Sequence, residues 1–416
     1  MAVATPDIHR SIEAIWRIEA PRLIGALARQ TRDVGRAEEL AQDALVAALQ
    51  TWPENGVPDR PGAWLMAAAN RRAIDAFRRD SMIERKHREL AGEGEGFDPG
   101  FEEAIDDGLG DDLLPLLFVA CHPLLSPESR TALTLRLLGG LTTAEIARAF
   151  LVPEATVAQR IVRAKRTLAE AKVPFEVPHG AERTARLASV LSVIYLIFNE
   201  GYSASAGDDW IRPDLCEDAL RLGRILAERM PEEAEAHGLV ALMELQASRL
   251  RARTGPNGEA VLLMDQNRAR WDWMLIDRGL AALGRAEKAG AAGPYTLQAA
   301  IAACHARART AEETDWARIA ALYAALAEVM PSPVVELNRA VAIGMAFGPA
   351  AGLDHLDTIA DAPVLADYHF LPAARGDLLA KLGRSDEARA EFERASALAR
   401  NERERDQLLG RAATVR

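Results

Sequence analysis

Residues 142–166 read TTAEIARAFLVPEATVAQRIVRAKR. The run opens on a capping box, because the Thr142 hydroxyl can accept a hydrogen bond from the Glu145 amide while the Glu145 carboxylate reaches back to the helix start. Leu151-Val152-Pro153 then interrupts the apolar periodicity, and a second periodic stretch follows. The segment therefore predicts a short helix, a tight turn and a longer second helix.

The second of these helices is amphipathic and basic. Apolar residues recur at helical spacing and predict a buried face of Val157, Ile161, Ala164 and Leu168. The outward positions are then Thr156, Gln159, Arg160, Arg163 and Arg166. A short helix and a tight turn before a basic, exposed helix are the geometry that docks in the major groove, where Arg pairs with guanine and Gln with adenine. We therefore predict that this segment binds duplex DNA; the plainer alternative is a helical hairpin with a solvated basic face.

The composition of the whole chain favours an all-α protein. Of its 416 residues, 49% are apolar and 27% are charged, as in globular proteins, and strand formers nowhere alternate over a long run. The three cysteines, Cys121, Cys216 and Cys304, lie far apart, and the N-terminus carries no apolar signal core. We expect a reduced, cytoplasmic chain without a membrane segment.

Charge is distributed unevenly along the chain. The net charge is −11, yet residues 60–90 carry eight Lys and Arg against four acids, and residues 142–172 carry six against three. Residues 91–112 carry nine acids and no base. Two basic segments are thus separated by an acidic strip, and the distribution says more about partners than the sum does.

Breaks in the pattern divide the chain into four segments. Residues 1–80 are expected to form a compact helical unit and residues 113–175 a second one. Residues 81–112 between them are rich in glycine and acid, which predicts a flexible linker. Residues 183–416 are predicted to be helical with short breaks.

A weak internal repeat runs through the last of these segments. Small and large apolar residues recur at matching offsets in residues 219–231, 319–331 and 388–395. This spacing is typical of the second helix of a tetratricopeptide unit, in which a small residue lets the paired helix approach. We therefore predict a domain of stacked helical repeats.

The first unit contains a capped helix followed by a basic one. Asp33 is placed to cap a helix whose apolar face is Ala37, Leu40, Ala41, Ala44, Leu45 and Ala48. Prolines are expected to break the chain at Pro53, Pro58 and Pro61, before a second helix at about 63–79. That helix interleaves Trp64 and Phe77 with arginines, a mixture that can stack on unpaired bases and neutralise the backbone. Both aromatic side chains fit a protein core equally well.

With a capped acidic helix, a basic aromatic helix and a helix-turn-helix in this order, the chain resembles the extracytoplasmic-function sigma factors. Residues 36–44, RAEELAQDA, followed by the helix at 64–79, resemble sigma region 2. Leu125-Ser126-Pro127-Glu128 and the helix-turn-helix resemble sigma region 4. The C-terminal half resembles the extension of a subgroup in which a tetratricopeptide-like domain is fused to the sigma regions. That subgroup implies control of activity by the extension, through contact with the sigma regions or with another protein.

The resemblance also implies partners and residue roles. The partners would be promoter DNA and core RNA polymerase, through the clamp coiled coil of its largest subunit and its flap. The clamp contact would be made by Glu38, Glu39, Gln42 and Asp43. The −10 element would be opened and held by Trp64, Asn70, Arg71, Arg72, Arg78 and Arg79. The −35 element would be read by Thr156, Gln159, Arg160 and Arg163, with phosphate contacts from Lys165 and Arg166. Ala158 replaces a basic residue that is common in the family, so no family promoter sequence is carried over.

Two other classes of protein compete with this interpretation. A stand-alone helix-turn-helix regulator with a repeat domain would need neither the acidic helix at 36–44 nor the aromatic and basic helix at 64–79. An enzyme would need a reactive cluster, but Cys121-His122 and Cys304-His305 are adjacent pairs that point apart on a helix. No metal-ligand spacing or nucleotide-binding glycine loop is present. We predict no catalysis, no cofactor and no metal.

Overall fold

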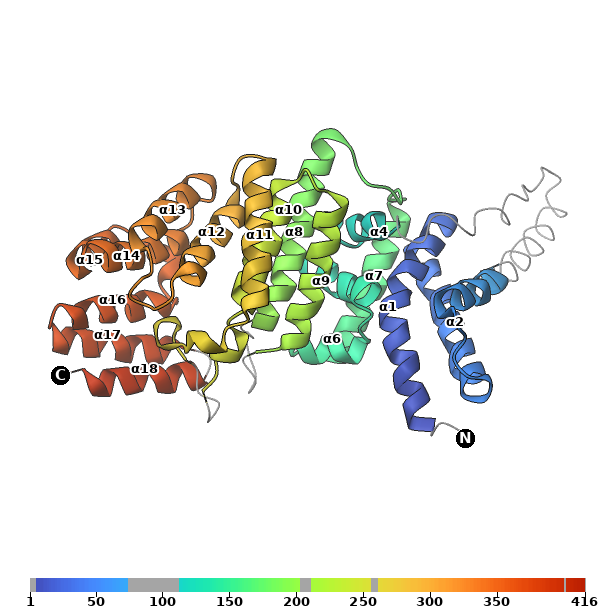
Figure 1. Ribbon diagram of the computed structural model, residues 1–416, viewed down its shortest axis with the longest axis horizontal. Helices are drawn as coiled ribbons and strands as arrows, with labels where there is room; N and C mark the ends of the chain where they lie inside the picture. The colour runs from blue at the N-terminus through green and yellow to red at the C-terminus, as the bar shows by residue number, and fades with distance from the viewer. Residues whose placement is uncertain (1–4, 74–111, 203–210, 256–260, 400–401, 416) are drawn as a thin grey trace. The chain divides into compact units, whose positions relative to one another are not determined.

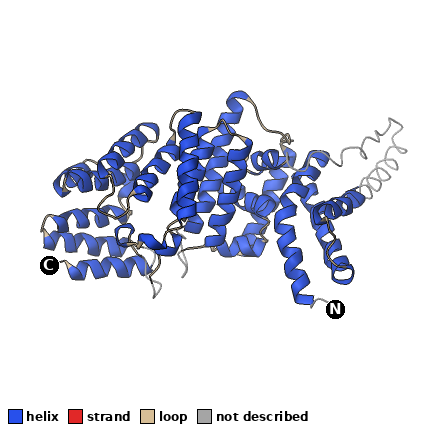
Figure 2. Ribbon diagram, viewed as in Figure 1, coloured by secondary structure: helices blue, strands red, loops and turns tan. Residues whose placement is uncertain are grey.

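The computed structural model describes residues 5–73, 112–202, 211–255, 261–399 and 402–415. These residues form helices joined by turns, with no β-strand among them (Figure 2), and the prediction of an all-α protein is confirmed. The chain divides into two compact units, Met1–Val193 and Ile194–Arg416. The predicted linker at 81–112 falls almost wholly outside the described residues.

The first unit holds the two short helical regions expected from the sequence (blue to green in Figure 1). Residues 61–73 are also helical. The other elements are α1 (Thr5–Thr31), α2 (Val34–Asn55), α4 (Leu113–Ala120), α5 (Pro127–Thr134), the π-helical turn η1 (Leu135–Gly139), α6 (Thr143–Phe150), α7 (Glu154–Glu170) and the first part of α8 (Gly180–Tyr202).

Helix α2 begins where the sequence places it but ends later than expected. The Asp33 carboxylate accepts hydrogen bonds from the amides of Gly35 and Arg36, at 2.7 and 3.1 Å, and so caps the helix. The expectation that Pro53 breaks the chain is wrong, because Pro53 lies inside α2. A proline removes one amide donor and kinks or ends a helix, and here the buried Trp52 immediately before it keeps the last turn in place. The helix ends instead at Gly56, whose φ of +80° suits glycine.

The start of α8 belongs to the first unit. Ser189 donates a hydrogen bond to the Cys121 carbonyl at 2.7 Å, and the buried Arg186 guanidinium donates to the Phe118 carbonyl at 3.0 Å. These contacts satisfy carbonyls at the C-terminal end of α4, which have no partner within their own helix. The sequence placed the start of the C-terminal region at residue 183, whereas the structure divides the chain at Val193, within α8.

The second unit consists of helices that pack on their neighbours in the chain (green to red in Figure 1). Its elements after α8 are α9 (Pro213–Arg229), α10 (Ala234–Ala247), the short 3₁₀ turns η2 (Leu250–Ala252), η3 (Leu263–Asp265) and η4 (Arg268–Arg270), α11 (Trp273–Ala289), α12 (Pro294–Arg307), α13 (Trp316–Val329), α14 (Pro333–Phe347), α15 (Pro349–Asp357), the 3₁₀ turn η5 (Pro363–Leu365), α16 (Phe370–Lys381), α17 (Ser385–Leu398) and α18 (Glu402–Thr414).

The repeated apolar positions lie on α9, α13 and α17 and face neighbouring helices. Ala219, Leu226, Ile319, Leu326, Ala388 and Phe392 are all buried. On α16, a Cβ added at Gly376 would lie 3.0 Å from the Phe392 ring of α17, so glycine is what allows this approach. Helix pairing of this kind supports the helical-repeat prediction, while the tetratricopeptide type of the repeat stays a prediction.

A half-buried carboxylate joins α10 to the start of α12. Glu235 accepts hydrogen bonds from the amides of Gly293, Tyr295 and Thr296 and from the Thr296 hydroxyl, at 2.6–3.2 Å. The first amides of a helix have no partner in their own helix. A carboxylate on one helix therefore caps another that is distant in sequence, a role that local pattern does not reveal.

His305, at the end of α12, makes the second unit sensitive to acid. Burial and the nearby Arg249 and Arg268 lower the pKa of His305 from 6.5 to about 4. Between these two pH values the unfolded chain binds a proton at His305 that the folded chain does not. The contribution of neutral His305 to the free energy of unfolding is therefore fully present above pH 6.5 and is lost as the pH falls toward 4. The gap corresponds to roughly 3 kcal/mol.

We expect the free energy of unfolding of the wild-type chain to fall between pH 7 and pH 4 by that amount more than in His305→Phe. The substitution keeps a ring beside Trp316, which packs edge-on against His305 at 5.2 Å between ring centroids, but removes the titrating group. Denaturant unfolding across the pH range is the measurement. Parallel curves for the two proteins would contradict the prediction.

Candidate nucleic-acid interface

The predicted helix-turn-helix is present as α6, a short turn and α7. The capping box is complete: the Glu145 amide donates to the Thr142 hydroxyl at 3.2 Å, and the Thr142 amide donates to the Glu145 carboxylate at 2.7 Å. Leu151 then adopts a left-handed conformation with φ +49° and ends α6. The predicted positions of both helices and of the turn are confirmed.

Helix α7 separates an apolar face from a basic one. Val157, Ile161, Ala164 and Leu168 are buried, as expected from the sequence. Gln159, Arg163 and Arg166 are exposed, while Thr156 and Arg160 are half-buried. Arg166 donates to Glu170 one turn later on the same helix, at 2.6 Å. An exposed face carrying Gln159 and Arg163 has the donors that base edges require.

Lys165 differs from the other predicted phosphate contact on α7. Its ammonium group pairs with the carboxylate of Glu38 on α2. Lys165 is therefore turned toward α2 in this arrangement, and a phosphate contact would require that pair to separate.

The aromatic and basic helix packs on α2. Trp64 meets Trp52 of α2 edge-on, with ring centroids 5.3 Å apart, and is half-buried. Asn70 is buried, whereas Arg71 and Arg72 are exposed. Arg72 lies 3.6 Å from the Asp43 carboxylate of α2. Arg78 and Arg79, as well as Phe77, lie outside the described residues.

The four polar residues predicted to contact polymerase divide into two pairs on α2. Glu39 and Asp43 are exposed, as a contact surface requires. Glu38 is buried, with 3% of its surface accessible. Gln42 is half-buried and donates to Glu38 at 2.6 Å. A one-residue step along a helix turns a side chain by about 100°, so adjacent acids here face different surroundings.

Glu38 is bound by two basic side chains from the helix-turn-helix region, Arg136 and Lys165. Arg136 donates to its carboxylate at 2.6 Å, and Lys165 pairs with the other oxygen. Burial alone would raise the pKa of Glu38, but the charges of Lys165 and Arg136 outweigh burial and hold it below the ordinary value of 4.5. The buried acid is therefore ionised and neutralised by these bases.

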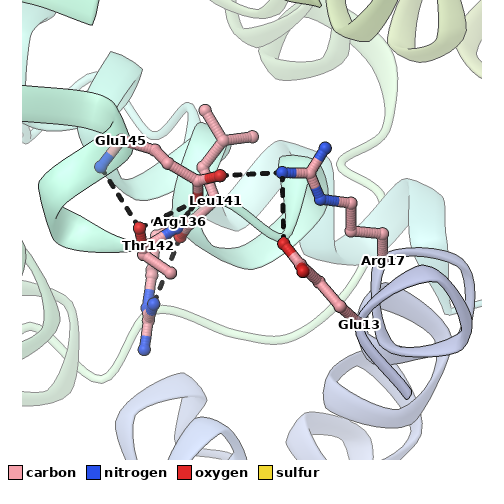
Figure 3. A network of polar contacts seen from close by, with 6 residues as sticks. All are labelled: Glu13, Arg17, Arg136, Leu141, Thr142 and Glu145. Atoms are coloured by element: carbon pink, nitrogen blue, oxygen red, sulfur yellow. Dashed lines mark hydrogen bonds and ion pairs between the residues drawn. The ribbon is translucent and has the colours of Figure 1, made fainter. Parts of the chain in front are cut away.

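A second ion pair joins α1 to α6. The Arg17 guanidinium donates to the Glu145 carboxylate at 2.7 Å and lies 3.9 Å from Glu13 (Figure 3). The same carboxylate closes the capping box of α6. Sequence reasoning did not single out Arg17 or Arg136, because neither lies in a motif and their partners are more than ninety residues away.

Family models match both halves of this arrangement. Residues 15–82 match sigma-70 region 2, and residues 116–168 match sigma-70 region 4. The two matches cover α1 to α2 with the following helix, and α4 to α7, in the order expected from the sequence. The chain belongs to the sigma factors of the extracytoplasmic-function type.

Two relatives named as sigma factors match the N-terminal part of the chain, and a third, uncharacterized relative matches most of it. A probable extracytoplasmic-function RNA polymerase sigma factor, SigI of Mycobacterium tuberculosis, is 25% identical over 188 residues, which are 44% of this chain and 62% of SigI. SigK of Mycobacterium sp. (strain KMS) is 29% identical over 163 residues, 38% of this chain and 81% of SigK. An uncharacterized protein of Rhizobium meliloti (strain 1021), R00370, is 45% identical over 383 residues, 92% of this chain and 90% of its own.

The sigma factor carries a C-terminal extension with a match of its own. Residues 186–287 match a family of unknown function, DUF6596. The search of solved structures gave no match.

Within the described parts of the chain, no helix combines the length and apolarity needed to cross a bilayer, and no group of three metal-ligating side chains comes together. Cys121 is buried and contacts Thr134 at 3.3 Å, and Cys304 is buried as well.

Proposed function

We propose that this sigma factor directs promoter-specific initiation by presenting α2 to core RNA polymerase and α7 to the −35 element. The observation that carries the proposal is the exposed basic face of α7. This helix is the second of a helix-turn-helix whose cap, turn and buried face are all formed. Sigma-family membership supports core polymerase and promoter DNA as the partners. A sigma factor acts by binding, which is consistent with a chain that is not an enzyme.

The polymerase contact is proposed to begin at the exposed carboxylates of α2. Glu39 and Asp43 lie one turn apart on the same face and are both exposed, although Asp43 also lies 3.6 Å from Arg72. We assign them to the clamp coiled coil of the largest subunit. Glu38 would join this contact only after it separates from Arg136 and Lys165, and Gln42 only after it releases Glu38.

The −10 contact is proposed to use the basic helix that follows α2. Arg71 and Arg72 are exposed on it, and Trp64 fixes its position against Trp52. Exposed arginines can neutralise the backbone of an unpaired strand, and a half-buried tryptophan leaves part of its ring for stacking. Arg78 and Arg79 are included in the proposal on the sequence pattern alone.

The test is transcription in vitro by core polymerase with the full-length protein on genomic fragments. Promoter-specific transcripts that depend on the added protein are the expected result. Strong, specific binding of the protein alone to duplex DNA, without stimulation of core polymerase, would instead identify a stand-alone regulator.

Arg160→Ala should weaken use of the cognate promoter by about 1–3 kcal/mol, because loss of a bidentate pair to guanine removes both hydrogen bonds. The loss should appear only at promoters that carry guanine at the position that Arg160 contacts. Arg148→Ala is the matched control, since Arg148 is an exposed base on α6 rather than α7. Unchanged transcription with Arg160→Ala, in a protein that unfolds like the wild type, would remove Arg160 from the set of base readers.

The C-terminal extension is proposed to regulate this activity. Stacked helices offer an extended face for another protein or for the sigma regions. Because α8 runs unbroken from the first unit into the second, removal of residues from 183 onward would also strip Arg186 and Ser189 from α4. A deletion meant to test regulation must therefore keep the chain at least to Val193.

A further inference from the structure

Two half-buried arginines of the second unit, Arg249 and Arg268, lie near each other without an acidic partner. Among the residues that the structure describes, neither guanidinium forms an ion pair. Arg224, which is also half-buried in this unit, binds Glu244 at 2.8 Å. Burial lowers the pKa of Arg268, and the charge of Arg249 lowers it further. Two like charges placed together without an acid cost free energy, which a bound anion would offset.

Buried polar atoms gather around Arg268. Its Nη1 group donates to the carbonyls of His305 and Ala308 at 2.5 and 2.8 Å, but its Nη2 group is buried and meets no acceptor among the described residues. Its Cζ lies 4.6 Å from the centre of the Trp271 ring, which is 3% exposed. The Trp271 indole nitrogen and the His305 Nδ1 are also buried, and both lack a partner within the described part of the chain. Folded proteins leave few buried polar atoms unpaired, so three of them around one guanidinium indicate a ligand site.

The chemistry of these groups suits an oxyanion that carries two negative charges. A guanidinium presents paired N–H groups that match phosphate oxygens, and an indole N–H can only donate. The neutral ring of His305 also donates when its proton is on Nδ1. Two cations call for about two negative charges, which a phosphate monoester carries at neutral pH. Glu312 and Glu313, whose charges reach Arg268, are exposed and therefore screened by solvent.

We infer that Arg249, Arg268, Trp271 and His305 form a binding site for a small ligand that carries a phosphoryl group. The donors are covered by protein, which favours a small ligand over a segment of another chain. Arg249 also donates to the Tyr202 hydroxyl at 3.1 Å, at the end of α8. A ligand on Arg249 is thus bound beside the helix that begins in the first unit. Only its regulatory effect rests on the proposed function of the extension; binding itself does not.

Titration calorimetry of the full-length protein tests the site with three probes at equal ionic strength: inorganic phosphate, glycerol phosphate and acetate. Saturable binding of a phosphate probe is expected, and acetate should not bind. Binding of inorganic phosphate would show that the free ion suffices, whereas binding of glycerol phosphate alone would assign the site to phosphate esters; both results support the inference. Absence of saturable binding by either phosphate probe, or binding of acetate as tight as that of phosphate, would overturn it.

Arg249→Gln should weaken binding of the phosphate probe at least about tenfold, because it removes one of two charges. Its amide can still donate to Tyr202. Arg251→Gln is the matched control, since Arg251 is exposed on η2 two residues away and should leave binding unchanged. Arg268→Lys keeps the charge, loses the planar fork and should also weaken binding. Equal affinities of the wild type and Arg249→Gln would refute the site.

His305 provides a readout that binding elsewhere on the protein would not move. Burial and the charges of Arg249 and Arg268 lower the pKa of His305 to about 4. A bound anion opposes these charges, favours the protonated ring and so raises that pKa. In NMR titrations of the wild type, with His305→Phe to identify the resonance, a saturating phosphate probe should raise the midpoint by at least about one pH unit. An unchanged midpoint at saturation would place the ligand elsewhere and overturn the inference.

These measurements need neither polymerase nor DNA. A protein that directs transcription but binds no phosphate probe would therefore refute this site and leave the proposed function intact. A protein that binds the probe but directs no promoter-specific transcription would refute the proposed function and leave the site intact.

Discussion

Trp52→Ala should lower the free energy of unfolding of region 2 by about 3–5 kcal/mol, as expected when a large buried aromatic side chain is truncated. Trp52 is 1% exposed at the end of α2 and packs edge-on against Trp64. It therefore joins the proposed polymerase-binding helix to the proposed −10 helix. Loss of the ring would release the second helix from the first, as well as leaving a cavity.

Denaturant unfolding of the full-length chain measures this effect, with transcription in vitro as a second readout. Trp52→Phe is the matched control, because it keeps a ring in the same place and should lose much less. An alanine variant that unfolds at the wild-type denaturant concentration would show that Trp52 does not hold the two helices together.

Gly238→Val should destabilise the second unit by at least about 3 kcal/mol, at the upper end of what overpacking costs. A Cβ at Gly238 of α10 would lie 2.7 Å from the amide nitrogen and 2.9 Å from the Cα of Thr296 on α12. These atoms are backbone, and they are fixed by the Glu235 cap, so no rotation of a side chain can relieve the clash. The two helices would have to move apart.

Gly284→Ala, in the same unit, should raise the free energy of unfolding instead of lowering it. Gly284 lies in α11, and a Cβ there meets nothing within 4 Å. Alanine should then stabilise the helix by up to about 1 kcal/mol, because it removes the backbone freedom of glycine in the unfolded chain. Thermal unfolding of the two variants should shift in opposite directions. A Gly238→Val protein as stable as the wild type would mean that α10 and α12 are not held at this distance.

The sequence predicted elements whose determinants lie within a few residues of one another. The capping box at Thr142 and Glu145, the cap at Asp33 and the buried face of α7 all formed as expected. Each depends on hydrogen bonds or periodicity spanning about one helical turn. The assignment to sigma regions 2 and 4 followed from these elements in their order.

The sequence failed where several local tendencies compete. Pro53 was expected to break the chain, yet α2 continues through it to Asn55. A proline weakens one turn, whereas the burial of Ala48 and Trp52 stabilises the turn that precedes it. The end of α2 was decided just beyond Asn55 by Gly56, whose positive φ a helix cannot continue.

By itself, then, the sequence determined that the chain is helical, where its helix-turn-helix lies, and which faces of α2 and α7 are apolar. Only the tertiary structure decided that Glu38 is turned inward while Glu39 faces solvent, and that Lys165 of the helix-turn-helix binds Glu38 instead of lying free for phosphate. The physical reason is range. Capping and periodicity act within one helical turn, but the bond from Arg136 to Glu38 joins residues 98 positions apart, and no local pattern encodes which base will meet a buried acid.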